Sequence, residues 1–181
     1  MQTAQAPGHG SRSVWAIDPT HSTVAFSIDN CFFFKVNGSF ADVGGTLVLD
    51  EEDVRGSSVK ATIKGKSIKT GNMRRDAHLR TSDFLDVDHY PDVLFQSTQV
   101  KHGTDRDMLS VVGELTIKGR SKEVVLIVGV VDRSRSPNGE EVLYYTAMTE
   151  LDRSDFGIKS SPWIIGRKLK VVINLQALKQ K

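Results

Sequence analysis

The sequence has few of the residues and runs that mark disulfide-rich, metal-binding or membrane-spanning proteins. Its one cysteine, Cys31, excludes an internal disulfide and a cysteine-rich metal site. There is no run of about eighteen apolar residues, so we expect no transmembrane helix. Opposite charges nearly cancel, with 24 Lys and Arg against 22 Asp and Glu, which is well short of the basic excess of nucleic-acid-binding proteins. No nucleic-acid partner is expected.

Motifs of nucleotide and metal chemistry are also missing. Neither a G-x-x-x-x-G-K-[ST] phosphate loop nor a G-x-G-x-x-G turn occurs. The histidines His21, His78, His89 and His102 are scattered without the spacing of a metal site. We therefore expect no metal and no cofactor.

What is present fits one globular domain. The 181 residues are 39% hydrophobic and 25% charged, close to the average of soluble proteins. Residues 1–13 are small, polar and without the apolar region of a signal peptide. We expect a flexible segment over 1–13, a single domain over 14–181 and a cytoplasmic protein. The alternative is a periplasmic or secreted protein whose signal peptide has been removed.

Alternation of apolar and polar residues predicts about eight strands. The predicted strands are 22–30, 46–50, 59–64, 93–97, 109–118, 123–131, 142–149 and 169–176. Gly44-Gly45 and the segment 134–139 (SRSPNG) are expected to be turns. Because no amphipathic helices lie between the strands, the sheet is predicted to be antiparallel. A two-sheet sandwich and a closed barrel both satisfy this pattern, and an eight-stranded barrel can hold one small ligand.

One segment breaks the alternation, and we expect a short helical insert around residues 73–88. Thr81 or Ser82 is placed to cap a helical turn over 83–85. The insert would plug a barrel end or cover a sheet edge.

Ionisable residues concentrate in the insert and in one later turn. Arg75, Asp76 and His78 could form an acid–base or anion site, or they could be a salt-bridged structural motif. We favour the structural interpretation because no nucleophile motif lies nearby. Between two later strands, Arg153 and Asp155 are interpreted as a turn in which Asp155 accepts backbone N–H bonds and Gly157 adopts positive φ.

An apolar run, Cys31 followed by three phenylalanines, ends the first predicted strand. Three consecutive exposed aromatic residues would promote aggregation. The run is therefore buried core, a membrane- or partner-facing lip, or the rim of an apolar cavity. Cys31 itself is expected to pack as a small apolar residue.

The order of three motifs resembles the YceI-like family of lipocalin-like proteins. The motifs are W-x-I-D-x-x-H-S-x-V-x-F over 15–26, R-D-x-H-L over 75–79 and R-x-D-F-G-I over 153–158. The resemblance implies an all-β, eight-stranded antiparallel barrel with a short helical insert, which often forms a homodimer. It also implies that a long apolar ligand threads the barrel. Where the family usually has a histidine at the end of the first long strand, this chain has Asn30, so we expect a different rim polarity.

From the resemblance we expect a carrier or storage protein without catalysis. The ligand would be a polyisoprenoid, an isoprenoid quinone precursor, or a fatty acid or amide. The candidate ligand-binding residues are Phe26, Ile28, Asn30, Phe33, Ile63, Phe95, Leu115, Leu126, Tyr144, Met148 and Ile173. The alternative is a small enzyme that acts on a hydrophobic substrate through His78 with Asp76, or through Arg153 with Asp155.

Overall fold

The computed structural model of the protein describes residues 12–32, 34–105, 107–161 and 163–181. Of the expected flexible segment 1–13, residues 1–11 lie outside the described residues, and Arg12 and Ser13 belong to the first strand. The strands are β1 (Arg12–Ile17), β2 (Thr23–Asn30), β3 (Lys35–Phe40), β4 (Val43–Asp50), β5 (Ser58–Lys64), β6 (Ile68–Lys69), β7 (Asp92–His102), β8 (Met108–Ile117), β9 (Arg120–Arg135), β10 (Glu141–Asp152) and β11 (Ile165–Lys179). The helical elements are α1 (Met73–Leu79) and the 3₁₀ turns η1 (Val54–Gly56), η2 (Gly65–Ser67) and η3 (Arg153–Phe156).

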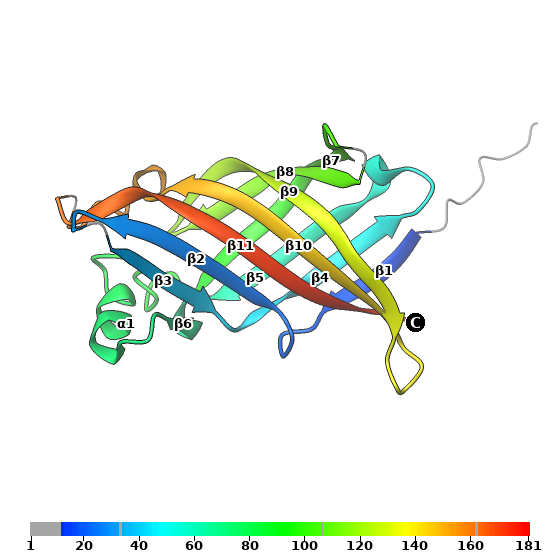
Figure 1. Cartoon of the computed structure of the whole chain (residues 1–181), viewed down its shortest axis with the longest axis horizontal. Coiled ribbons are helices and arrows are strands. Elements are labelled where there is room, and N and C mark those ends of the chain that lie inside the picture. Colours follow the sequence, from blue (N-terminus) through cyan, green and yellow to red (C-terminus); the bar gives the residue numbers. More distant parts are fainter. Residues whose placement is uncertain (1–11, 33, 106, 162) are drawn as a thin grey trace, which may run out of the picture.

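Eight strands form a closed antiparallel barrel (Figure 1). Hydrogen bonding runs in the order β1-β4-β5-β7-β8-β9-β10-β11, and β11 then pairs with β1 to complete the ring. Of the two architectures that the strand pattern allows, the structure therefore adopts the barrel. Closure leaves no unpaired sheet edge around the ring.

Three places in the ring, those of β1, β4 and β5, are each extended lengthwise by a second short strand. β2 continues the position of β1 by pairing with the other half of β11, β3 continues β4 by pairing with β2, and β6 continues β5 by pairing with β3. Asp18 shapes the first break, because its carboxylate accepts bonds from Thr20 N and lies 2.7 Å from His21 Nδ1. These extra strands lengthen the barrel toward α1.

The expected turn at Gly44-Gly45 is wrong, since both glycines lie inside β4. Gly45 has a φ of 145°, and a Cβ at this position would lie 2.1 Å from the carbonyl oxygen of Lys60 on β5. A glycine at this position allows the backbones of β4 and β5 to approach closely, so these glycines belong to a strand and do not mark a turn.

The helical insert lies between β6 and β7 at one end of the barrel (Figure 1). Helix α1 begins after Asn72, whose side-chain oxygen accepts a bond from Arg75 N at 3.1 Å. The expected cap at Thr81 or Ser82 is wrong: Thr81 Oγ1 donates to the His78 carbonyl at 2.7 Å and so satisfies the end of α1. Within the described residues, no helix has the length and apolar character needed to cross a bilayer.

Inward-facing apolar side chains form two buried clusters. One surrounds Trp15, Val43 and Leu143, and the other surrounds Phe95 and Phe156. Inward residues between them, such as Phe26, Ile63 and Leu126, are only partly buried. Such residues are incompletely covered because they border an open interior rather than a packed core.

Candidate functional site: the barrel lumen

A cavity of about 700 Å³ occupies the interior of the barrel. Apolar side chains from β2, β3, β4, β5, β7, β8, β9, β10 and β11 form most of its wall, and polar side chains are confined to a few positions. This volume lies within the range of about 300 to 1,000 Å³ that is typical of small-molecule sites.

Seven of the candidate ligand-binding residues lie on the wall of this cavity. They are Phe26, Ile28, Ile63, Phe95, Leu115, Leu126 and Ile173. Phe33 lies outside the described residues. The alternation pattern therefore selected the inward face correctly on β2, β5, β7, β8, β9 and β11.

Two candidates on β10 do not face the lumen. Met148 is 49% exposed, and the wall is formed instead by Tyr145, Ala147 and Thr149, whereas Tyr144 is absent from it. Both faces of β10 are apolar, and its register with β9 shifts between Tyr144 and Tyr145. That shift places the extra residue on β9, while β10 pairs without interruption with β11 from Val142 to Asp152. Because both faces of β10 are apolar, the sequence pattern had no way to fix which one is inward.

Asn30 also lies away from the cavity wall. Its side-chain oxygen accepts bonds from Phe32 N and Phe34 N, both at 3.0 Å, and thereby shapes the turn between β2 and β3. The expectation that Asn30 sets the polarity of the cavity rim is replaced by a structural role.

The end of the barrel opposite α1 is covered by Trp15. Its ring is fully buried, and Arg133 and Lys179 lie 5.6 and 5.7 Å from the ring centroid. Glu141 binds both cations, and these bonds, first that from Lys179 and then that from Arg133, lower the pKa of its carboxyl. Tyr145 lines the lumen nearby, and burial raises the pKa of its hydroxyl.

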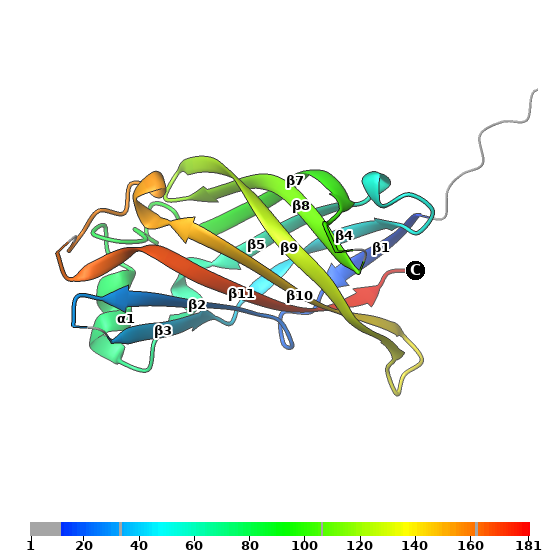
Figure 2. The same cartoon turned by 45° about the horizontal axis from the view of Figure 1, so that its top comes forward.

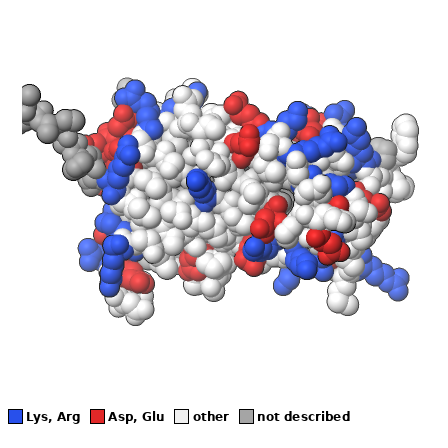
Figure 3. All heavy atoms as spheres, turned by 180° about the vertical axis from the view of Figure 1, so that it is seen from behind, with Lys and Arg blue, Asp and Glu red and all other residues white. Residues whose placement is uncertain are grey.

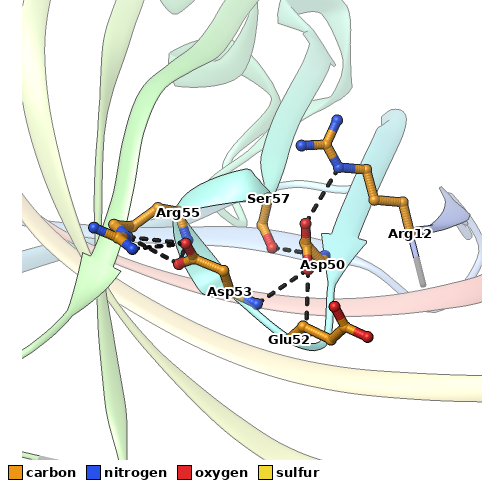
Figure 4. A network of polar contacts seen from close by, with 6 residues as sticks. All are labelled: Arg12, Asp50, Glu52, Asp53, Arg55 and Ser57. Carbon is orange, nitrogen blue, oxygen red and sulfur yellow. Dashed lines mark hydrogen bonds and ion pairs between the residues drawn. The ribbon is translucent and has the colours of Figure 1, made fainter. Parts of the chain in front are cut away.

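A second polar network closes the turn between β4 and β5 at the same end (Figure 4). Asp50 Oδ1 accepts bonds from the backbone N–H groups of Glu52 and Asp53, and Oδ2 accepts one from Arg12. The backbone bond from Asp53 is the largest influence that lowers the pKa of Asp50. The turn also places Ser57 and Ser58 on the cavity wall.

The cavity reaches the surface beside α1. Four residues of the wall, Asn72, Arg74, Arg75 and His78, are also solvent-exposed, and together they define what we call the α1 mouth. Ser58 is a further exposed wall residue, next to η1. Three basic side chains therefore stand where the apolar lumen meets water.

The Arg75-Asp76 pair of the R-D-x-H-L motif ties the insert to the end of β6. The buried Asp76 carboxylate accepts bonds from Thr70 N at 2.8 Å and Thr70 Oγ1 at 2.6 Å. Arg75 donates to Thr70 Oγ1 and to the Thr70 carbonyl. This arrangement fits the structural interpretation, because the hydroxyl and the carbonyl of Thr70 are both bonded to the insert.

His78 contacts a different carboxylate from the one that the catalytic alternative assumed. Its Nε2 lies 3.0 Å from Asp83, and its ring packs edge-on against Phe84 at a centroid distance of 5.1 Å. The His78–Asp83 contact joins α1 to the turn that follows it. Since Asp76 is bonded to Thr70, the predicted partnership of His78 with Asp76 is not what the structure has.

Arg153 is the buried centre of the R-x-D-F-G-I motif. Its guanidinium donates four bonds of 2.8 to 3.1 Å to the backbone carbonyls of Ile158, Ser160, Ile165 and Gly166. It is 6% exposed, and burial lowers its pKa, while Asp152 opposes that shift. The side chain therefore holds the loop between β10 and β11 in one conformation.

The turn around Arg153 differs from its prediction in one residue. Asp155 is exposed, and the backbone N–H of Ser154 is instead bonded by Asp152 at 2.9 Å. Gly157 does adopt positive φ, at 74°, as expected. Both Asp152 and Asp155 lie near the turn, and only the backbone path decides which one caps η3.

Several residues of the site had no individual signal in the sequence. Asn72 and Tyr145 reach the cavity wall because of the position of α1 and the phase of β10. Trp15 was recognised only as part of a motif. Across the described part of the chain, no group of three or more His, Cys, Asp or Glu residues is arranged to hold a metal ion.

Comparison with known proteins gives the same fold and a family. The model of the YceI-like domain matches residues 15–177. "Protein YceI" of Shigella flexneri is 32% identical over 161 residues, which are 89% of this chain and 83% of that protein. Among solved structures, BcnA of Burkholderia cenocepacia has a TM-score of 0.78 at 20% identity, over 88% of this chain and 98% of that one.

A polyisoprenoid binding domain from Saccharophagus degradans has the same fold, with a TM-score of 0.71 at 13% identity over 92% of this chain and 98% of that domain. The motifs, the closed barrel and the match of the family model agree over nearly all described strands. The chain belongs to the YceI-like family.

Proposed function

We propose that the protein binds a long-chain apolar ligand inside the barrel, as a carrier or store, and does not chemically change it. The candidate ligands are a polyisoprenoid, an isoprenoid quinone precursor, and a fatty acid or amide. The observation that carries the proposal is the continuous apolar lumen of about 700 Å³. The structurally similar domain from Saccharophagus degradans is a polyisoprenoid binding domain, which supports this ligand class.

The size of the lumen fits one long chain. Because one water molecule occupies about 30 Å³, the cavity has room for roughly twenty groups the size of a methylene. Each methylene removed from water contributes about 0.8 kcal/mol, so burial alone gives a gross stabilisation of about 16 kcal/mol. This gross gain is opposed by the loss of ligand motion and chain freedom on binding, so the measured affinity is expected to be lower.

The ligand's polar end is expected at the α1 mouth. The opposite end is covered by Trp15 and its cations, whereas Arg74 and His78 are exposed lining residues. We therefore propose that the hydrocarbon tail enters first and that the polar group remains near α1.

The bonding of the motif residues supports binding rather than turnover. The Asp76 carboxylate is held by Thr70, and all four bonds of Arg153 go to backbone carbonyls. A group that is committed to the fold in this way is poorly placed to exchange protons with a substrate.

The test is extraction of the purified protein with organic solvent, followed by mass spectrometry. We expect one long-chain lipid per protein, and we expect the stripped protein to take up a fluorescent long-chain fatty acid at the same ratio. An empty protein that takes up no probe contradicts the proposal. Recovery of the probe with a changed mass, lost in His78→Ala without a loss of stability, would favour the enzyme instead.

A further inference from the structure

Four large apolar side chains are exposed at one end of the molecule. Phe32 and Phe34, in the turn between β2 and β3, are 65% and 69% exposed. Trp163 and Ile164, in the loop between β10 and β11, are 89% and 52% exposed. We call these four residues the loop tip. Of the alternatives for the Cys31–Phe34 run, buried core is excluded for both described phenylalanines.

The two loops of the tip are held together and fixed to the barrel. Cys31 N donates to the Ile164 carbonyl at 2.9 Å. Asn30 fixes the first loop through two backbone N–H groups, and Arg153 fixes the second through four carbonyls. These bonds fix the backbone beside the exposed side chains.

The loop tip lies at the same end as the α1 mouth (Figures 1 and 2). Ser160 Oγ, in the second loop, donates to the Asp83 carbonyl of the insert at 2.6 Å. Lumen-lining residues flank both loops: Ile28 and Val36 beside the first, Ile158 and Ile165 beside the second. Each loop of the tip therefore joins segments that line the cavity.

Basic side chains accompany this apolar surface. Lys35, Lys159 and Arg74 are exposed, and among the described residues none of the three has an ion-pair partner, although Asp29 lies opposite Lys35 in the strand register. Figure 3 shows Lys and Arg side chains, interspersed with acidic ones, at this end of the molecule, on the right of the view. Exposed Trp and Phe beside Lys and Arg is the composition of segments that rest in the membrane interface.

We propose that the loop tip docks onto an anionic lipid bilayer, with its aromatic side chains among the headgroups and the basic side chains facing anionic lipids. This rests on the proposed function, since docking here lets a lipid pass between the bilayer and the lumen along apolar surface. A second copy of the chain fits less well. It would bring Lys35, Lys159 and Arg74 of one copy toward the same residues of the other, whereas an anionic surface neutralises them.

The chain carries two native reporters for the test. Its one cysteine, Cys31, is exposed within the first loop and can be labelled with an environment-sensitive thiol dye. Of its two tryptophans, Trp15 is fully buried and Trp163 is 89% exposed. On vesicles of phosphatidylcholine and phosphatidylglycerol at 3:1, we expect dye emission to rise and tryptophan emission to shift to shorter wavelength. The tryptophan shift should vanish in Trp163→Phe.

Matched variants separate the tip from general stickiness. Trp163→Ala should weaken vesicle binding roughly tenfold, and Trp163→Ala with Phe34→Ser roughly a hundredfold. The control is Ile127→Ser with Met148→Ser, two apolar residues that are 40% and 49% exposed on the barrel wall, and binding should not change. Lys35→Gln with Lys159→Gln should weaken binding to the anionic vesicles by about fivefold per lysine. Lys60→Gln with Lys101→Gln, at exposed positions on β5 and β7, should leave it unchanged.

Three results would overturn docking. The first is the absence of any emission change on the anionic vesicles. The second is an equal loss of binding in the control variant Ile127→Ser with Met148→Ser. The third is a dimer in sedimentation that Trp163→Ala converts to a monomer. Uptake of a soluble fatty acid probe, measured without vesicles, reports on the lumen alone. Normal uptake with no vesicle binding therefore rejects docking and leaves the proposed function standing.

Discussion

Ligand affinity should depend on chain length in a way that the lumen dictates. For a series of saturated fatty acids, each added methylene should lower Kd by about fourfold, because burial contributes about 0.8 kcal/mol per group. The gain should stop when the cavity of about 700 Å³ is full, near roughly twenty groups. Longer chains should then bind no more tightly.

A tryptophan placed inside the lumen should move that plateau. Ala147 lies on the cavity wall, near the middle of β10, and is 5% exposed. Ala147→Trp adds about nine heavy atoms and should therefore displace roughly nine methylene-sized groups. The longest chains lose about 7 kcal/mol of burial, so their Kd should rise at least a thousandfold, while chains of about ten carbons bind as before.

The neighbouring residue supplies the control. Met148 follows Ala147 directly and points outward, with 49% exposure. Met148→Trp therefore adds a similar bulk outside the barrel and should leave the plateau unchanged. The assay is displacement of a fluorescent fatty acid at concentrations below micelle formation, with urea unfolding to check that both variants fold. If Ala147→Trp leaves the plateau where it was, or Met148→Trp moves it equally, the lumen is not the binding site.

Three further outcomes follow from the polar contacts. Arg153→Met should destabilise the protein by about 4 kcal/mol in urea unfolding, because four carbonyls lose a charged donor; a loss below about 1 kcal/mol would contradict this. The pKa of Glu141 is lowered from 4.5 in the fold by its bonds to Lys179 and Arg133. The stabilisation of the fold by these bonds is therefore complete above about pH 4.5 and disappears as the pH falls through the folded pKa. Emission of Trp15, measured in a Trp163→Phe background, should report this loss below about pH 4, and Glu141→Gln should remove the pH dependence. Asp76→Ala should increase hydrogen exchange in the insert while strands far from it keep their protection, since the Thr70 bonds are lost; uniform protection would refute that role.

The barrel and most of its inner face could be predicted from the sequence. On β8, Leu109, Val111, Leu115 and Ile117 lie at odd-numbered positions of one strand face, and all four line the lumen. The closed ring followed from the family resemblance, since the strand pattern alone also allowed a sandwich. Alternation worked because one face of each of these strands meets water and the other does not.

Two kinds of detail could not be predicted. On β10 both faces are apolar, so alternation cannot choose between Tyr144 and Tyr145; the pairing of Tyr145 with the lumen-lining Leu175 on β11 decides. The partners of Arg153 are backbone carbonyls, which exist at every residue and leave no trace in the sequence. The cap was predicted at Thr81 or Ser82, whereas Asn72 caps α1; all three residue types are suitable N-caps, so residue type alone does not choose among them.

The indole of Trp15 at one end of the tube has a consequence for the order of events. Where Trp15 keeps that end shut, a lipid that enters beside α1 leaves by the route it came, and a second lipid cannot push it out from behind. Release therefore precedes reloading, so exchange should be first order in the loaded protein and independent of the concentration of competing lipid. Any acceptor would meet the polar group of the cargo before its tail.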